Sequence, residues 1–261
     1  MSLKGKRALV TGSTSGIGLG VARALCSQGV RVMLNGFGDP DEIERLRKAM
    51  IEEFAVDVAY VDADLTEATE VERLVRSAIE TFGGLDILVN NAGVQFVSPI
   101  EDFPIEQWNK IIALNLSAVF LGMRAAIPTM KSQGWGQIIN IASAHGLVAS
   151  PHKVAYVAAK HAVVGATKVA ALELANDGVT VNAICPGWVL TPLVEHQIED
   201  RARVAGTSVN YESEELLREK QPMLTFTSPA SVGSLVVFLC SDAATTMTGA
   251  PISIDGGWTA Q

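Results

Sequence analysis

The stretch Thr11-Gly12-Ser13-Thr14-Ser15-Gly16-Ile17-Gly18 decides the fold, because it joins an apolar strand to a helix through three closely spaced glycines. Residues 7–11 (RALVT) predict the strand, and residues 16–28 predict the helix. A dinucleotide pyrophosphate needs a backbone that can approach closely and a helix N-terminus that faces its charge. The spacing Gly-x3-Gly-x-Gly therefore predicts a dinucleotide-binding loop, with an ordinary strand-to-helix turn as the alternative.

Strand and helix patterns alternate along the rest of the chain. Short apolar runs separated by helical stretches imply right-handed crossovers and a parallel sheet that is covered on both faces. We therefore expect an α/β fold, with residues 1–261 forming a single doubly wound (Rossmann) domain around a seven-stranded parallel sheet. Residues 189–222 are polar without a strand signal, and we expect a small helical lid there. The further strands are expected at 31–35, 58–61, 87–90, 137–141, 180–184 and 252–254, and the further helices at 41–54, 67–82, 105–130 and 151–176.

Composition excludes several classes of protein. The apolar fraction of 48% can fill a core, and the net charge of −8 makes nucleic acid and anionic membranes poor partners. Three cysteines lie far apart in apolar runs, which is typical of buried free thiols in a reducing compartment. No Cys/His spacing predicts a metal site, and we expect no signal peptide, no membrane-spanning helix and a cytoplasmic location.

The end of the second strand bears on the choice of cofactor. An acidic residue there would bind the adenosine ribose, and a basic one would bind a 2′-phosphate. The chain has Asn35-Gly36-Phe37 instead, with no Lys or Arg in residues 12–18 or 35–38. By elimination this favours NAD over NADP. Asp64, after the third strand, is interpreted either as an adenine contact or as an acid at a helix N-terminus.

Two lysines accompany a tyrosine in the stretch 150–160. Ser150-Pro151 predicts a helix start, so Lys153, Tyr156 and Lys160 would share one face of that helix. A nearby ammonium favours a phenolate, and we expect the pKa of Tyr156 to lie below its ordinary value of about 10. Such a phenol suits proton exchange with an alcohol. The alternative is a solvated surface face.

The motifs taken together resemble a known family. With Asn90-Asn91-Ala92-Gly93, Asn115, Ser143, Tyr156-x3-Lys160 and Pro186-Gly187 in order, the whole chain is identified as a member of the short-chain dehydrogenase/reductase family. This resemblance implies that Tyr156 exchanges the proton, Lys160 lowers its pKa and binds the nicotinamide ribose, Ser143 binds the substrate oxygen, and Asn115 helps to hold a relay water. The residues expected to line the cofactor are Gly12, Thr14, Ser15, Gly16, Ile17, Gly18, Phe37, Asp64, Leu65, Asn91, Gly93, Tyr156, Lys160, Pro186, Val189 and Thr191.

Further segments resemble the branch of this family that acts on D-3-hydroxybutyrate: Gln95 after the Asn-Asn-Ala-Gly motif and residues 143–153, 185–197 and 256–261. This implies a small anionic hydroxy or keto acid, whose carboxylate needs a cation and hydrogen-bond donors. The expected substrate residues are Gln95, Ser143, His145, Lys153, Tyr156, Trp188, Gln197 and Trp258. Lys153 would supply the cation, whereas the two tryptophans would close around a methyl group. Alternatives are a surface role for Gln197, a loop role for His145, and a core or interface role for Trp258.

Three functions are kept apart at this stage. The first is the interconversion of (R)-3-hydroxybutyrate and acetoacetate with NAD. The second is a 3-oxoacyl reductase or another short-chain alcohol dehydrogenase. The third is a cofactor-sensing protein without turnover, a class that tends to lose the Tyr/Lys pair. The resemblance also implies a homotetramer, with the C-terminal strand near an interface.

Overall fold

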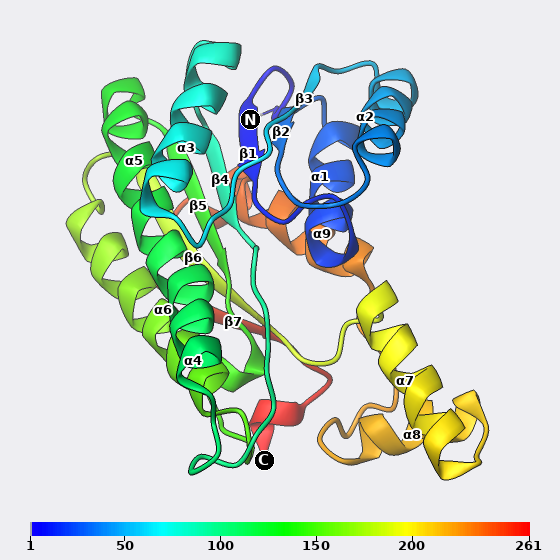
Figure 1. The fold of residues 1–261 in the computed structure, drawn as a ribbon. Coiled ribbons are helices and arrows are strands. Elements are labelled where there is room, and N and C mark those ends of the chain that lie inside the picture. The colour runs from blue at the N-terminus through cyan, green and yellow to red at the C-terminus, as the bar shows by residue number, and fades with distance from the viewer. Residues whose placement is uncertain (1) are drawn as a thin grey trace.

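A parallel sheet of seven strands forms the centre of the computed structural model, which describes residues 2–261 (Figure 1). The strand order is β3-β2-β1-β4-β5-β6-β7. The first three strands extend to one side of β1, and β4 to β7 extend to the other side, so the order reverses between β1 and β4. In such sheets a crevice opens at the carboxyl ends of the strands where the order reverses. The strands are β1 Arg7–Val10, β2 Arg31–Leu34, β3 Val58–Tyr60, β4 Ile87–Asn90, β5 Gly136–Ile141, β6 Val179–Pro186 and β7 Pro251–Ile254.

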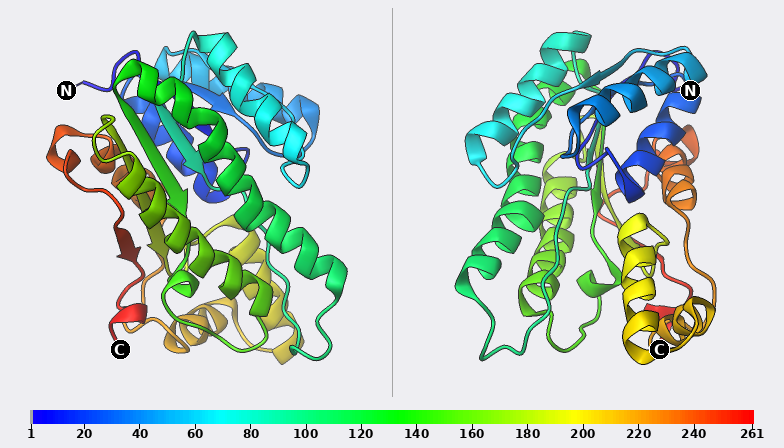
Figure 2. Two further views of the ribbon diagram at one scale, coloured as in Figure 1. Left: turned by 90° about the vertical axis from the view of Figure 1, so that its left-hand side faces the viewer. Right: turned by 45° about the vertical axis from the view of Figure 1, so that its right-hand side comes forward.

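Helices cover both faces of the sheet (Figures 1 and 2). Side chains alternate between the faces, so Leu9 of β1 belongs to one apolar cluster while its neighbour Val10 belongs to the other. Burial on both sides explains why the strands are continuous apolar runs. One layer contains α1 Gly16–Ser27, α2 Pro40–Phe54 and α9 Pro229–Leu239, and the other contains α3 Ala68–Phe82, α5 Ala118–Gln133 and α6 Val154–Glu173.

A long helical segment runs from α4 (Ile105–Ile112) through the π-helical turn η1 (Ala113–Ser117) into α5. Among the described residues, its 29 residues are long and apolar enough to cross a membrane by length and composition alone. Met123, Ala126 and Met130 of α5 pack into the core on one face of the sheet. This packing accounts for the apolar composition of the segment.

The start of α6 differs from the sequence-based expectation. The helix begins at Val154 and not at residue 151, because His152 has a left-handed backbone with φ 65°. Ser150 does not cap the helix, and its Oγ lies 2.9 Å from Nε2 of His145 instead. Lys153 is the N-cap residue of α6. Tyr156 and Lys160 remain one turn apart on this helix.

The helix α9 has no counterpart among the elements expected from the sequence. Its residues are apolar on nearly every side, so no polar face marks it as a helix. Glycines let it pack closely on α1: a Cβ at Gly20 would lie 2.6 Å from Cβ of Pro229, and a Cβ at Gly233 would lie 2.7 Å from O of Gly20. The C-terminal part of the chain therefore forms part of the helix layer next to the nucleotide-binding loop.

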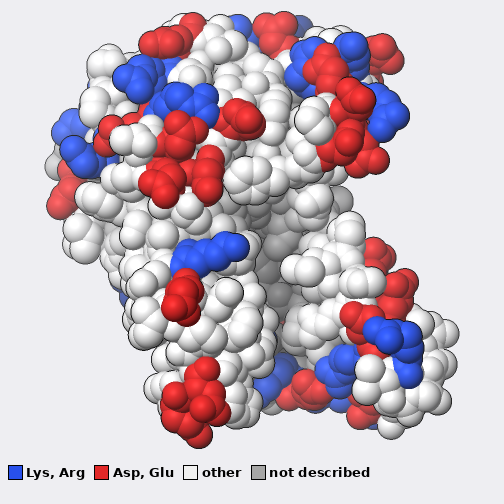
Figure 3. All heavy atoms as spheres, viewed as in Figure 1, with Lys and Arg blue, Asp and Glu red and all other residues white. Residues whose placement is uncertain are grey.

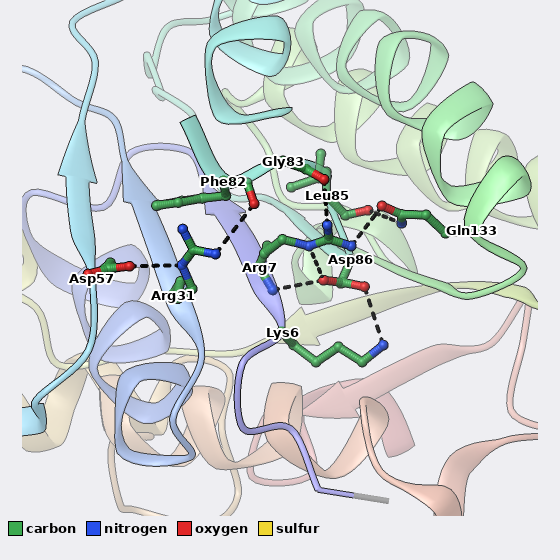
Figure 4. Close-up of polar contacts among 9 residues, drawn as sticks. All are labelled: Lys6, Arg7, Arg31, Asp57, Phe82, Gly83, Leu85, Asp86 and Gln133. Carbon is green, nitrogen blue, oxygen red and sulfur yellow. Dashed lines mark hydrogen bonds and ion pairs between the residues drawn. The ribbon is translucent and has the colours of Figure 1, made fainter. Parts of the chain in front are cut away.

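A buried carboxylate fastens the amino ends of β1 and β4 (Figure 4). Asp86 accepts hydrogen bonds from Nε of Arg7 at 2.6 Å and from the Arg7 backbone at 2.9 Å, and Lys6 Nζ lies 3.3 Å away. Arg7 also donates to Gln133 of α5 at 2.7 Å. The charges therefore join two strands and a helix at the end of the sheet opposite the crevice.

Residues 187–227 leave the sheet after β6 and return at α9. They contain α7 (Pro192–Ala205) and α8 (Val209–Arg218), and we call this segment the α7–α8 projection. Arg201 of α7 binds Glu212 of α8 at 3.2 Å and Glu219 beyond it at 2.8 Å, which joins the two helices. Figures 1 and 2 show the projection beside the body of the molecule, below α9. The short helical turns are η2 Ala144–Gly146, η3 Asp242–Ala244 and η4 Trp258–Ala260.

Candidate active site

A cavity of about 940 Å³ lies between the carboxyl ends of the strands and the α7–α8 projection. Figure 3 shows the molecular surface hollowed between these two parts. The cavity extends from the glycine-rich loop at one end to Trp258 of the C-terminal segment at the other. The cavity therefore lies where a crevice is expected, at the switch point between β1 and β4.

Nearly all the residues singled out in the sequence reach this cavity. The exceptions are Gly18 and Asn115, which lie directly behind its wall. The lining includes Gly12, Thr14, Ser15, Gly16, Ile17, Phe37, Asp64, Leu65, Asn91, Gly93, Gln95, Ser143, His145, Lys153, Tyr156, Lys160, Pro186, Trp188, Val189, Thr191, Gln197 and Trp258. The fold thus brings together the residues expected for catalysis, for cofactor binding and for substrate binding.

The glycine-rich loop has the shape that a pyrophosphate needs. Gly12 and Gly16 adopt left-handed φ angles of 60° and 54°, which residues other than glycine rarely adopt. A Cβ at Gly18 would overlap O of Gly12, so this glycine allows the loop to pack on α1 rather than lining the cavity. The N-terminus of α1 points its backbone N–H groups at the cavity, and the Ser15 side chain makes no capping hydrogen bond in the described structure. These features fit a nicotinamide dinucleotide.

The Asn-Asn-Ala-Gly motif supports the loop from beneath. Nδ2 of Asn91 donates to O of Thr11 at 2.9 Å and to O of Gly12 at 3.0 Å. Asn115 in η1 is fully buried, and its side chain both accepts from and donates to the backbone of Val94 at 2.9 Å. Asn115 therefore holds the irregular segment that follows the motif.

Ser143, Tyr156 and Lys160 meet at the middle of the cavity. Ser143 follows β5, whereas the other two project from the first turns of α6. Nζ of Lys160 lies 5.6 Å from the centroid of the Tyr156 ring and donates to O of Ile141 at 2.8 Å. The Ser143 side chain lies close enough to the Tyr156 hydroxyl to influence its pKa. A substrate oxygen at this point would be within reach of two hydroxyl groups.

Burial changes the acidity of this pair. Burial raises the pKa of the Tyr156 phenol, and the Ser143 side chain lowers it by less. The expectation of a lowered pKa is therefore wrong for the protein alone, because the loss of water on burial dominates the shift. Burial also lowers the pKa of Lys160 to about 8, although the nearby Cys185 acts in the opposite direction.

Aromatic rings and one lysine enclose the far end of the cavity. Trp188 and Trp258 stack with centroids 6.1 Å apart, and the His145 ring meets Trp258 edge-on at 5.0 Å. Nζ of Lys153 lies 5.6 Å from the centroid of Trp188. This end therefore combines a cation with apolar walls.

His145 is held by its neighbours rather than by backbone alone. Its Nε2 lies 2.9 Å from Oγ of Ser150, and only 4% of the residue is exposed. Burial, together with the charges of Lys153 and Lys220, lowers the pKa of His145 to about 4. At neutral pH its ring is therefore uncharged.

Burial similarly lowers the pKa of Lys153, although the carboxylate of Glu219 opposes that effect. Lys153 therefore loses its charge at a lower pH than an exposed lysine does.

Asp64 fixes a turn and also lines the cavity, whereas its contact with adenine stays a prediction. Its Oδ1 accepts from N and Oγ1 of Thr66 at 2.9 and 2.7 Å, which fixes the turn before α3, and the residue also lines the cavity. The Thr66 backbone hydrogen bond lowers the pKa of Asp64, and Lys110 of α4 contributes to this shift. Lys110 and Asn109 also line the cavity, and the sequence pattern did not identify them. Their position depends on where α4 crosses the cofactor end, which no local motif reveals.

The sequence and the fold are matched by known proteins. A family profile described as enoyl-(acyl carrier protein) reductase matches residues 12–259. The chain belongs to the short-chain dehydrogenase/reductase family of oxidoreductases.

Two curated relatives are similar over nearly their whole length. A D-beta-hydroxybutyrate dehydrogenase of Cupriavidus necator is 56% identical, over 99% of this chain and 100% of that protein. One of Rhizobium meliloti is 54% identical, over 98% of this chain and 99% of that protein. Among solved structures, the L-sorbose reductase of Gluconobacter frateurii, complexed with NADPH and L-sorbose, has a TM-score of 0.95 and 31% identity, with all of both chains covered.

Proposed function

We propose that the protein interconverts (R)-3-hydroxybutyrate and acetoacetate, with NAD as its cofactor. The observation that carries this proposal is the position of Lys153 beside the Trp188–Trp258 wall, in the same cavity as Tyr156 and Ser143. A cation at one end and an acid/base at the other match a small molecule with a carboxylate and a secondary alcohol. The similarity to two D-beta-hydroxybutyrate dehydrogenases supports the same substrate.

The side chains of this protein would handle the proton. When bound, the nicotinamide would supply hydride acceptance and donation. Ser143 and Tyr156 would hydrogen-bond the substrate oxygen, and Tyr156 would take its proton during oxidation or return it during reduction. The ammonium of Lys160, held by O of Ile141, would stabilise the phenolate and hold the ribose hydroxyls. Asn115 would keep the Val94 backbone in place and support a proton-relay water.

The far end of the cavity would recognise the carboxylate. Lys153 would supply the charge, and Gln95, Gln197 and neutral His145 would supply hydrogen bonds. Trp188 and Trp258 would leave an apolar space that fits a methyl group. Each extra methylene would have to displace part of this aromatic wall, so the pocket favours a short chain.

The adenosine end supports NAD over NADP. The side chain of Asn35 is committed to O of Val61 and Ala63, at 3.2 and 3.3 Å, and the next residues are Gly36 and exposed Phe37. No cation stands at residues 35–38 to bind a 2′-phosphate. Lys110 reaches this end of the cavity but faces Asp64. Because the structurally similar sorbose reductase binds NADPH, the preference of this protein between NAD and NADP is to be measured.

Three further properties belong to the proposal. The α7–α8 projection would act as the lid over the substrate end, since seven of its residues from Trp188 to Gln197 line the cavity. The protein would work in the cytoplasm. It would assemble as a homotetramer, because α6 exposes Val169 and Leu172 at 56% and 80%.

Initial rates with the purified protein test the proposal. NADH formation is measured with (R)- and (S)-3-hydroxybutyrate, a neutral secondary alcohol and a 3-hydroxyacyl thioester, each with NAD and with NADP. We expect the R enantiomer with NAD to give the highest kcat/KM. Preference for the thioester with NADP would favour a 3-oxoacyl reductase instead, and NAD binding without turnover of any substrate would favour a sensing role.

A further inference from the structure

Gln221 is a buried amide at the base of the α7–α8 projection, outside the cavity lining. Only 1% of the residue is exposed. Because burial of an amide without hydrogen-bond partners is unfavourable, its contacts show what the position requires. Gln221 follows α8, at the point where the projection turns back towards α9.

Both the oxygen and the nitrogen of the Gln221 amide form hydrogen bonds with backbone groups. Its Oε1 accepts from N of Trp188 at 3.2 Å, and its Nε2 donates to O of Met223 at 3.2 Å and to O of Thr225 at 2.5 Å. Trp188 lies where the chain enters the projection, whereas Met223 and Thr225 lie where it leaves. One N–H and two carbonyls fix the orientation of the amide, so Gln221 links both roots of the projection.

The C-terminal segment packs against the same amide. A Cβ at Gly187 would lie 2.7 Å from Oε1 of Gln221, and a Cβ at Gly256 would lie 2.6 Å from its Cγ. N of Met223 donates to O of Gly256 at 2.9 Å. Both glycines therefore make room for Gln221 between the projection and the turn that carries Trp258.

These contacts lead to the aromatic wall of the cavity. Trp188 is held through its backbone by Gln221 and stacks on Trp258, which follows the Gly256–Gly257 turn. Asp255 fixes that turn by accepting from N of Gly257 at 3.1 Å and from N of Thr259 at 3.0 Å. The separation of the two tryptophan rings thus depends on how the projection and the C-terminal segment meet at Gln221.

We propose that Gln221 is a positioning residue for the substrate pocket: it holds the two roots of the projection against the C-terminal segment and so sets the Trp188–Trp258 wall. The inference rests on the proposed function for its substrate, but the clamp itself is a property of the protein without ligand. Loss of the amide would leave one N–H and two carbonyls without their partner and let Trp188 move. The glycine-rich loop lies at the other end of the cavity, so dinucleotide binding would be preserved.

The variant Gln221→Met tests the clamp, with Gln133→Met as its matched control. Gln133 also bonds a side chain and a backbone carbonyl, those of Arg7 and Leu85, but at the opposite end of the sheet (Figure 4). We expect both changes to lower the melting temperature. Only Gln221→Met should raise KM for (R)-3-hydroxybutyrate, by about 10- to 100-fold, with the Kd for NADH within about twofold of the parent. Equal KM values in the two variants would overturn the proposal.

A spectroscopic measurement separates the clamp from the choice of substrate. With 5-fluorotryptophan at the four tryptophans, ¹⁹F NMR of the ligand-free protein reports on each ring. Gln221→Met should shift the resonances of Trp188 and Trp258 and leave that of Trp108 in place, whereas Gln133→Met should leave all three in place. If the parent does not oxidise 3-hydroxybutyrate, the proposed function fails, and these shifts still decide on the clamp. Unchanged Trp188 and Trp258 resonances would overturn it.

The parent protein gives a test that does not depend on the variant folding. The N–H of Trp188 donates to the buried Oε1 of Gln221, so hydrogen exchange at this amide should be protected to the same degree as at buried β6. Exchange as fast as at the exposed residues of α7 would mean that the clamp does not hold, whatever the substrate.

Discussion

The ammonium of Lys160 lies 5.6 Å from the centroid of the Tyr156 ring and is anchored by a 2.8 Å hydrogen bond to O of Ile141 in β5. The anchor fixes the charge relative to the sheet, whereas Tyr156 is held by its place in helix α6. The two groups therefore keep their relative position, which a proton donor and its electrostatic partner need.

The pH dependence of the two reaction directions should differ. Oxidation needs Tyr156 without its proton, and burial raises the pKa of that phenol, so kcat/KM for (R)-3-hydroxybutyrate should rise with pH. Reduction needs the protonated phenol, so kcat/KM for acetoacetate should have its optimum at lower pH. Steady-state rates over a pH series check this, and superimposable profiles would contradict the assignment.

Lys153→Met should weaken recognition of the carboxylate. A lost charge-assisted hydrogen bond is worth about 1.5 to 3 kcal/mol, so KM for (R)-3-hydroxybutyrate should rise about 10- to 100-fold. KM for a neutral secondary alcohol should change little. Lys168→Met is the matched control, since it removes the same charge from an exposed position of the same helix. An equal loss for acid and alcohol would sink the carboxylate assignment.

The carboxylate binding should also weaken at high pH. Burial lowers the pKa of Lys153, so its charge is present at low pH and is lost as pH rises through that reduced value. KM for (R)-3-hydroxybutyrate should therefore increase on the alkaline side while the Kd for NADH stays constant. In Lys153→Met this alkaline increase should disappear, and its persistence there would assign it to another group.

Asp86→Ala should lower stability without changing the site. It removes a buried carboxylate that pairs with two partly buried cationic groups, Lys6 and Arg7, and should cost about 3 kcal/mol in the free energy of unfolding. Asp177→Ala, which breaks the more exposed pair with Lys131, should cost less than about 1 kcal/mol. Urea unfolding measures both, and equal costs would mean that the network at the amino ends of β1 and β4 has no special role.

The exposed face of α6 should matter for assembly. Leu172→Lys places a charge on a helix surface where Val169 and Leu172 are 56% and 80% exposed, and it should give a species smaller than the parent in light scattering. Val204→Lys is the control, because Val204 is 82% exposed but belongs to α7. A Leu172→Lys protein with the parent mass would remove this face from the interface.

The order of the elements could be predicted because strands buried on both faces are apolar runs and the helices between them are amphipathic. The seven-stranded doubly wound sheet and the family are confirmed. The motifs were informative because each of them follows a strand directly: Gly12, Asn91, Ser143 and Pro186 all reach one edge of a parallel sheet. In a parallel sheet the carboxyl ends of all strands lie at the same edge. A motif that follows a strand in the sequence can therefore be placed at that edge without further structural information.

Other features needed the tertiary structure. Helix α9 is apolar on nearly all sides and shows no periodicity, and the left-handed backbone of His152 moves the start of α6 from 151 to 154. The raised pKa of Tyr156 reflects burial by distant segments, whereas only the neighbouring lysines were visible in the sequence. Gln221 carries no motif at all, because it bonds backbone groups on two segments, at Trp188 and at Met223 and Thr225, and packs against a third at Gly256.

The central claim is that the phenol of Tyr156 carries the proton, and single-turnover oxidation by Tyr156→Phe tests it most directly. The ring keeps its packing in this variant, so NADH should bind with the parent Kd in a fluorescence titration. Mixed with NAD and (R)-3-hydroxybutyrate, the variant should form NADH at least about 1000-fold more slowly than the parent. A rate close to that of the parent, with dinucleotide binding intact, would contradict the role of Tyr156.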